Sequence, residues 1–204
     1  MTIDQLMSTQ KVMAIFRNHE PAQAVALASK AWDLGMDLVE VPVQVASALP
    51  TLKAVVRAGA ERDKPVGAGT VTTVDQLRDV GAAGVAFTVA PGLDPEIVAQ
   101  SAAMGLPHLP GVSTPTEIQA ATRLGCTWVK AFPASVLGLA WFGAMQGPFP
   151  HVSLVATGGI NADNANDFLG AGASTVAVGS ALTDARQVRL LAQILSEGAP
   201  AQRS

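Results

Sequence analysis

The chain has 204 residues, of which 49% are hydrophobic and 14% are charged, and its formal net charge is -3. The charges form no basic block, so the composition does not favour a nucleic-acid partner. No apolar run approaches the roughly 18 residues that a membrane span needs. The N-terminal sequence MTIDQLMSTQ lacks the basic region and apolar core of a signal peptide, so we expect a cytoplasmic protein.

Short apolar runs typical of buried strands recur along the chain, and each is followed by a segment with helical spacing. In chain order, the predicted strands cover residues 11–16, 37–43, 65–70, 84–90, 106–111, 127–132, 152–158 and 174–179. Residues 21–35 and 161–172 are two of the helical segments. Glycines that we interpret as helix C-caps precede the later runs, at Gly35, Gly59, Gly81, Gly105, Gly125, Gly147 and Gly172.

The spacing of these glycines, 20 to 25 residues by subtraction, indicates a repeating strand–helix unit. Eight such units predict an α/β fold with a single (β/α)8 TIM barrel, and the length fits one domain over residues 1–204. A leucine-rich solenoid has a similar period, but its leucine and asparagine frame is absent. In a barrel, the chemistry lies where the strands end and the following loops begin.

Two charged residues stand alone within apolar strands, Glu40 in the second predicted strand and Lys130 in the sixth. These strands lie across a barrel from each other, so the two side chains could meet inside. Burial lowers the pKa of a lysine and supplies the neutral amine that forms an imine with a carbonyl, while a carboxylate can move the protons. The alternative is an ion pair that only fills the barrel, but such pairs rarely improve stability. We therefore favour a catalytic pair.

Two neighbouring predicted strands, the seventh and the eighth, end in glycines: Gly158 and Gly159, and then Gly179, which Ser180 follows. In barrels, these two loops commonly bind phosphate through backbone N–H groups. Tight turns would use glycine as well, so either loop alone is weak evidence. Their occurrence at the expected pair of strands favours a phosphate site.

The histidines His19, His108 and His151 are scattered and have no ligand spacing, so we expect no metal ion and no other cofactor. We interpret His108 as a packed or hydrogen-bonded residue of the barrel. The single cysteine, Cys126, excludes an internal disulfide, and we interpret it as a small core residue rather than a reactive thiol.

Between about Lys11 and Leu195, the chain contains in order the segments AIFR, LVEVPV, VGAGTV, VAPGL, LPGVSTPTE, VKAFPA, GPFPHVSLVATGGINADN and VGSAL. Together they resemble the 2-keto-3-deoxy-6-phosphogluconate (KDPG) aldolase family. The resemblance implies a class I aldolase on a TIM barrel, usually a homotrimer. Its substrate would be the phosphorylated keto acid KDPG, cleaved to pyruvate and glyceraldehyde 3-phosphate, and several members also cleave 4-hydroxy-2-oxoglutarate.

By this resemblance, Lys130 is the Schiff-base lysine and Glu40 is the general acid/base. Arg17 and Thr70 lie near the pyruvate carboxylate. Gly158, Gly159 and Ser180 match the phosphate-binding loops, to which the strand-end pattern adds Gly179. The remaining predicted residues of the substrate pocket are Gln44, Pro91, Phe132 and Thr157.

Two departures from the family pattern bear on the substrate. Some members carry an arginine at the position of Gln44, so we expect Arg17 to supply the guanidinium here. The segment after VKAFPA has Leu139 and Gly143 where the family often has proline and lysine. Arg17 also resembles the branch that acts on the galactonate epimer, whereas Thr157 resembles the gluconate branch, which we favour. The rival functions are a phosphosugar isomerase or epimerase that forms no imine and a noncatalytic phosphosugar-binding barrel.

Overall fold

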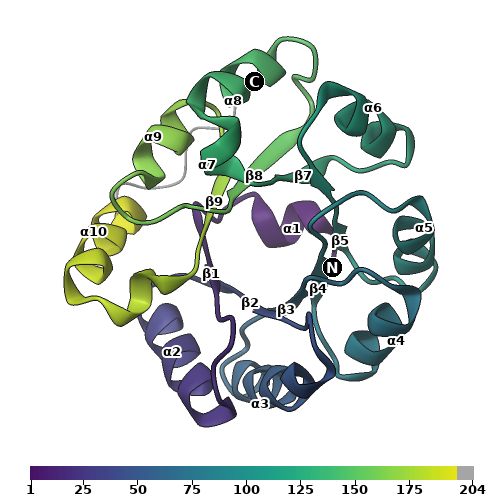
Figure 1. Ribbon diagram of the computed structural model, residues 1–204. Helices are drawn as coiled ribbons and strands as arrows, with labels where there is room; N and C mark the ends of the chain where they lie inside the picture. The colour runs from purple at the N-terminus through teal and green to yellow at the C-terminus, as the bar shows by residue number, and fades with distance from the viewer. Residues whose placement is uncertain (197–204) are drawn as a thin grey trace.

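A ring of parallel strands forms the centre of the molecule (Figure 1). The computed structural model describes residues 1–196, apart from the side chains of Ser180 and Ala181. The strands are β1 (Val12–Ile15), β2 (Leu38–Pro42), β3 (Val66–Gly69), β4 (Phe87–Val89), β5 (His108–Leu109), β6 (Gly111–Val112), β7 (Trp128–Ala131), β8 (Ser153–Thr157) and β9 (Thr175–Val178). Their order is β5-β4-β3-β2-β1-β9-β8-β7-β6. The predicted (β/α)8 barrel is confirmed.

The fifth predicted strand is divided into β5 and β6 by Pro110, which has no N–H group to donate. Both pieces keep their place in the ring. Ala90 donates its N–H to the carbonyl oxygen of Leu109 at 3.0 Å, and Lys130 donates to that of Pro110 at 2.8 Å. The ring therefore closes between β4 and β7, and the sixth to eighth predicted strands are β7, β8 and β9.

Helices surround the ring and bury their apolar faces against it (Figure 1). They are α2 (Pro21–Asp33), α3 (Leu49–Ala60), α4 (Val74–Ala82), α5 (Pro95–Ala103), α6 (Pro115–Arg123), α7 (Ala134–Leu137), α8 (Leu139–Gln146), α9 (Ala165–Gly170) and α10 (Ala185–Ser196), with 3₁₀ turns η1 (Ala46–Ala48) and η2 (Ser180–Thr183). Thr73, Asp94 and Thr114 cap the N-termini of α4, α5 and α6 with their side-chain oxygens. These caps begin each helix a few residues after a strand ends, which keeps the connecting loops short.

A further helix, α1 (Ile3–Met7), was not predicted, and it lies within the outline of the strand ring in Figure 1. Leu6 and Met7 pack in the interior with Leu38 and Trp128, the first residues of β2 and β7. The Trp128 indole donates its N–H to Asp4 Oδ1 at 2.6 Å. This helix fills the end of the barrel where the strands begin, so the opposite end carries the predicted site.

Four of the predicted glycine C-caps are confirmed by positive φ angles, at Gly35, Gly105, Gly125 and Gly172. The predictions for Gly59 and Gly81 were wrong. Gly59 lies inside α3, where a Cβ atom would come within 2.7 Å of the Lys64 carbonyl oxygen. Gly84 rather than Gly81 takes the left-handed conformation after α4. Gly147 is the C-cap of α8 as predicted, in a right-handed conformation with a φ of -62°.

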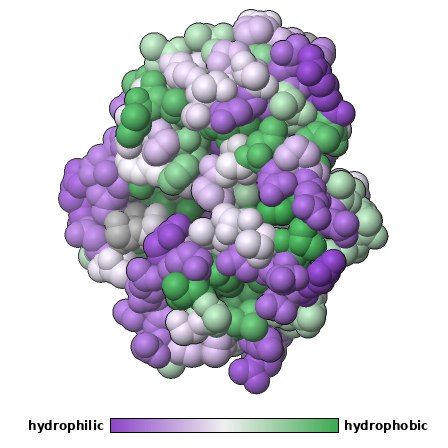
Figure 2. Space-filling model, turned by 45° about the vertical axis from the view of Figure 1, so that its right-hand side comes forward, coloured by the Kyte–Doolittle hydropathy of each residue, from purple (hydrophilic) through white to green (hydrophobic). Residues whose placement is uncertain are grey.

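The described helices include none long and apolar enough to cross a membrane. Figure 2 shows hydrophobic residues in separate clusters among hydrophilic ones on one face of the molecule. The exposed large hydrophobic side chains of residues 1–196 include Val45, Met104, Val136 and Leu139. Single exposed apolar residues of this kind are ordinary on soluble proteins and by themselves indicate no partner.

Candidate active site

Lys130 and Glu40 are both buried inside the barrel, with exposed fractions of 3% and 1%. Side chains alternate between the two faces of a strand, and Leu38 and Trp128 point into the interior cluster. Glu40 and Lys130, two residues further along β2 and β7, therefore point inward as well. This placement agrees with the prediction that the amine and the carboxyl group meet inside the barrel.

Burial disfavours the charged form of each group. It raises the pKa of Glu40, while the nearby charges of Lys130 and Arg17 act in the opposite direction. It lowers the pKa of Lys130; the Glu40 carboxylate opposes this change and the Arg17 guanidinium adds to it. The Oε2 atom of Glu40 is buried and has no hydrogen-bond partner within residues 1–196. The barrel thus holds a potential nucleophile and a potential proton carrier near each other.

Gly69, at the end of β3, makes room for the Glu40 carboxyl group. A Cβ atom at this position would lie 1.2 Å from Glu40 Oε1 and 2.2 Å from its Cδ atom. The next residue, Thr70, has a φ of 61°, an uncommon conformation for a residue other than glycine. Backbone strain of this kind occurs mostly at functional sites, and here it lies beside Glu40.

Phe132 links Lys130 to the first predicted phosphate loop. The Lys130 Nζ atom lies 4.9 Å from the centre of the Phe132 ring. The same ring lies 3.0 Å from the position that a Cβ atom of Gly158 would take. The amine and the loop after β8 are therefore neighbours at one end of the barrel.

The loop after β8 makes a left-handed turn, with φ angles of 96° at Gly158 and 73° at Gly159. Ser135 packs against it: its N–H donates to the Gly158 carbonyl oxygen at 3.0 Å, and its Oγ atom lies 2.2 Å from the position of a Gly159 Cβ atom. Gly179 follows the adjacent strand β9, and a Cβ atom there would meet none of the described atoms within 4 Å. The prediction for the side chain of Ser180 falls outside what the structure describes.

Arg17 and Gln44 lie beyond the ends of β1 and β2, and Thr70, the other residue predicted to bind the carboxylate, directly follows β3. Arg17 is exposed, yet its charge affects the pKa of both Glu40 and Lys130. Gln44 does not extend freely toward this pair, because its Nε2 group donates to Asn18 Oδ1 at 2.8 Å. Its Oε1 atom is buried without a partner in the described part of the chain.

The remaining predicted pocket residues also lie at strand ends. Thr157 ends β8, is 4% exposed, and has a buried Oγ1 atom without a partner among residues 1–196. Pro91 follows β4 and contacts β6 closely, since a Cβ atom on Gly111 would lie 2.2 Å from its carbonyl oxygen. His108 is hydrogen-bonded as predicted, with Nδ1 2.8 Å from Thr88 Oγ1.

Three residues of the site were missed from the sequence: Asn18, Gly69 and Ser135. A glycine inside a strand often marks a close approach, so Gly69 had a readable signal. Asn18 and Ser135 had none, because their contacts join loops that are distant in sequence.

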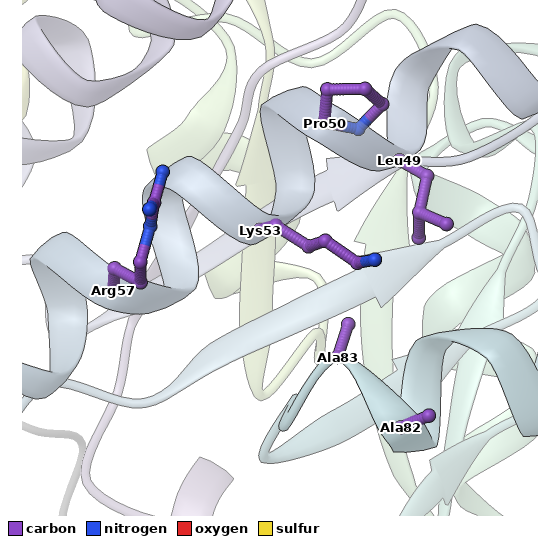
Figure 3. Close-up of a pocket in the computed structure, with 6 residues that line it drawn as sticks. All are labelled: Leu49, Pro50, Lys53, Arg57, Ala82 and Ala83. Atoms are coloured by element: carbon purple, nitrogen blue, oxygen red, sulfur yellow. The ribbon is translucent and has the colours of Figure 1, made fainter.

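Two hollows of the surface lie away from these residues. One of about 500 Å³ lies on the outside of the barrel between α3 and α4, and Lys53, Arg57, Ala82 and Ala83 are among the residues that line it (Figure 3). Another, of about 310 Å³, is lined by residues that include Lys11 and Leu195. Neither contains a predicted site residue. We locate the site by its buried charged groups, since these have a chemical use that the outer hollows lack.

A neutral amine beside a carboxyl group can form an imine with a keto acid and move the accompanying protons. The family model for KDPG and KHG aldolase matches residues 3–194. The chain belongs to this family. Its aldolases are carbon–carbon lyases, so the chain is an enzyme of that class.

Proteins similar to this chain are named for different substrates. A 2-dehydro-3-deoxy-phosphogluconate aldolase of Treponema pallidum (strain Nichols) is 34% identical over 169 residues, covering 82% of this chain and 80% of that protein. A 2-dehydro-3-deoxy-6-phosphogalactonate aldolase of Escherichia coli (strain K12) is 29% identical over 177 residues, 86% of each chain. The crystal structure of a KDPG aldolase from Legionella pneumophila, with pyruvate captured as a covalent carbinolamine, has a TM-score of 0.81 and 27% identity, covering 96% of this chain and 97% of that one.

Proposed function

We propose that this aldolase cleaves KDPG to pyruvate and glyceraldehyde 3-phosphate through an imine on Lys130. The observation that carries the proposal is the burial of Lys130 near Glu40, with the pKa of the amine lowered and that of the carboxyl raised. Both shifts move the pKa toward neutral pH. The amine is therefore more often neutral, and the carboxyl group can more readily give and take a proton, than in free side chains.

In the proposed reaction, the neutral Nζ atom of Lys130 attacks the C2 carbonyl, and an amine proton passes to the new hydroxyl group of a carbinolamine. Glu40 donates the proton with which this hydroxyl leaves as water, and a protonated imine remains. The Glu40 carboxylate then accepts the C4 hydroxyl proton as the C3–C4 bond breaks. The bonding electrons form an enamine and glyceraldehyde 3-phosphate leaves. Protonation at C3 and hydrolysis of the imine release pyruvate and restore Lys130.

Reductive trapping separates this proposal from its rivals. Borohydride added with pyruvate should attach a stable three-carbon adduct to Lys130, which peptide mass spectrometry would locate. An isomerase in which Lys130 acts only by its charge would give no adduct. A noncatalytic binding barrel would release no pyruvate from the six-carbon substrate in a coupled assay.

The proposal assigns the substrate carboxylate to Arg17 and Thr70, and the phosphate to backbone N–H groups of Gly158, Gly159 and Gly179 with the Ser180 hydroxyl. Arginine offers paired donors that match a carboxylate. The positive φ angles of Gly158 and Gly159 give a turn whose backbone a phosphate could approach closely.

Gly179→Ala tests the phosphate assignment, because the added methyl group meets no atom of the described part of the chain within 4 Å. We expect the variant to cleave the phosphorylated six-carbon substrate at least about tenfold less well, with 4-hydroxy-2-oxoglutarate, which has no phosphate, unaffected. Equal losses on both would contradict the assignment. Gly159 is unsuitable for this test, since a side chain there would strain the turn and strike Ser135.

The galactonate epimer is the second candidate substrate, because relatives with either name are similar to this chain. We favour the gluconate, since Thr157 precedes the glycine turn as in the gluconate branch that the sequence resembles. The choice can be tested by measuring initial rates side by side with both epimers and with 4-hydroxy-2-oxoglutarate. A higher kcat/KM for the galactonate would overturn the preference.

We further propose a single-domain, cytoplasmic enzyme that acts as a homotrimer, the trimer being what the family resemblance implies. Light scattering of the purified chain would test the trimer. A monomer with full activity would contradict it.

A further inference from the structure

Two loops at the mouth of the barrel are joined by one side-chain hydrogen bond. Gln44, just beyond β2, donates from Nε2 to Asn18 Oδ1, just beyond β1, at 2.8 Å. The backbone bonds between β1 and β2 reach Phe16, whose N–H donates to the Glu40 carbonyl oxygen at 2.9 Å. The hydrogen bond from Gln44 thus joins the two segments beyond the backbone bond at Phe16. Arg17 lies in the chain between these two points of attachment.

Asn18 needs support in its backbone conformation. Its φ of 59° is left-handed, a region that asparagine tolerates better than most residues but that still costs free energy. The next residue is also anchored, because Thr51 Oγ1 donates to the His19 carbonyl oxygen at 3.1 Å. Arg17 therefore lies between Phe16 and Asn18, both of which are held in place.

Gln44 itself is badly suited to binding a carboxylate. One of its two Nε2 hydrogens is used in the bond to Asn18, and its other polar side-chain atom, Oε1, is an acceptor, buried and without a partner in residues 1–196. An acceptor repels a carboxylate. Arg17, by contrast, is a cation at the end of β1, near enough for its charge to act on the pKa of both Lys130 and Glu40.

We propose that Gln44 is a positioning residue: its bond to Asn18 fixes the turn after β1 and thereby directs Arg17 toward the carboxylate of a keto acid bound at Lys130. The inference rests on the proposed function. Gln44 acts on keto-acid affinity through Arg17 and takes no part in proton transfer.

The test measures the pyruvate concentration that gives half-maximal borohydride trapping on Lys130. Gln44→Met removes the hydrogen bond at nearly constant size. This concentration should rise about fivefold, the factor that corresponds to about 1 kcal/mol, while the trapping rate at saturating pyruvate stays within twofold. Asn18→Gly, which allows the left-handed turn but loses the acceptor, should raise it at least as much, because the bond is lost and glycine gives the turn more freedom; no rise would contradict the role of the bond. Gln100→Met, on the exposed side of α5, is the matched control.

Gln44→Met made in an Arg17→Met variant decides whether Gln44 positions Arg17 or contacts the keto acid directly. If Gln44 acts through Arg17, Gln44→Met has no further effect in that background. A full fivefold effect there, or a fivefold fall in the saturating trapping rate, would overturn the inference while the imine on Lys130 stands. A wild-type enzyme that traps no pyruvate overturns the proposed function, and this inference with it. Circular dichroism and Tm show that each variant compared is folded.

Discussion

Replacing Gly69 with alanine tests the role of Glu40 without altering Glu40 itself. The new Cβ atom would lie 1.2 Å from Glu40 Oε1 and 2.9 Å from its Cγ atom. The φ of Gly69 lies outside the left-handed region, so the backbone accepts alanine at this position. The carboxyl group must therefore move while the strand stays in place.

The size of the displacement follows from the contact distances. Real Cβ atoms essentially never lie within 3.0 Å of such a neighbour, so Oε1 has to shift by about 2 Å. A misplacement of about 1 Å can cost about 10²-fold in rate, and loss of a general acid/base costs about 10²–10⁴-fold. We expect Gly69→Ala to lower kcat by about 10²–10³-fold.

The assay is steady-state kcat for the six-carbon substrate, with Tm measured on the same samples. Gly170→Ala, at the end of α9, is a neutral control because its Cβ atom meets nothing within 4 Å. Gly67→Ala is a steric control: it would strike the Phe87 ring at 2.3 Å and should cost about 1–3 kcal/mol of stability with kcat within tenfold. A folded Gly69→Ala variant with kcat within about threefold of wild type would refute the reasoning.

Three further predictions follow from the same geometry. Lys130→Ala should remove essentially all turnover, and more than about a hundredth of wild-type kcat would contradict the imine. Glu40→Gln should lower kcat by about 10²–10⁴-fold while pyruvate is still trapped slowly, whereas a normal rate would move the acid/base role elsewhere. Burial lowers the pKa of His108 from 6.5 to about 4, so the unfolded chain binds a proton between these pH values that the folded chain does not. The free energy of unfolding should therefore fall as pH drops from 6.5 to about 4. This fall should be smaller in His108→Gln than in His151→Gln, which alters an exposed histidine, and equal falls would exclude His108 as a cause.

The barrel was predictable because its strands are buried on both faces and therefore stand out as apolar runs at a regular interval. Within such runs a charged residue is conspicuous, which is why Glu40 and Lys130 could be found without a structure. Their strands lie on opposite sides of the ring, and alternation along each strand places both side chains inside.

The parts that were not predictable depend on contacts between distant segments. The five-residue helix α1 has too short a pattern to identify, and it is held by tertiary contacts such as that of Asp4 with Trp128. Gly59 and Gly81 follow the glycine spacing, yet the helices continue past them, because packing overrides a local C-cap signal.

The interior of the barrel argues against the view that Lys130 and Glu40 only fill space. A pair kept for stability would satisfy its polar atoms, because a buried unpaired acceptor costs about 1–3 kcal/mol. Here Glu40 Oε2 has no hydrogen-bond partner in the described chain, and the Glu40 carboxyl group lies against Gly69, which makes room for it. No ion pair joins Glu40 to Lys130 within residues 1–196. Filling the same space with apolar side chains would avoid the cost. The arrangement is understandable if the missing partner is a substrate, whose hydroxyl group donates to the carboxylate only when the keto acid is bound.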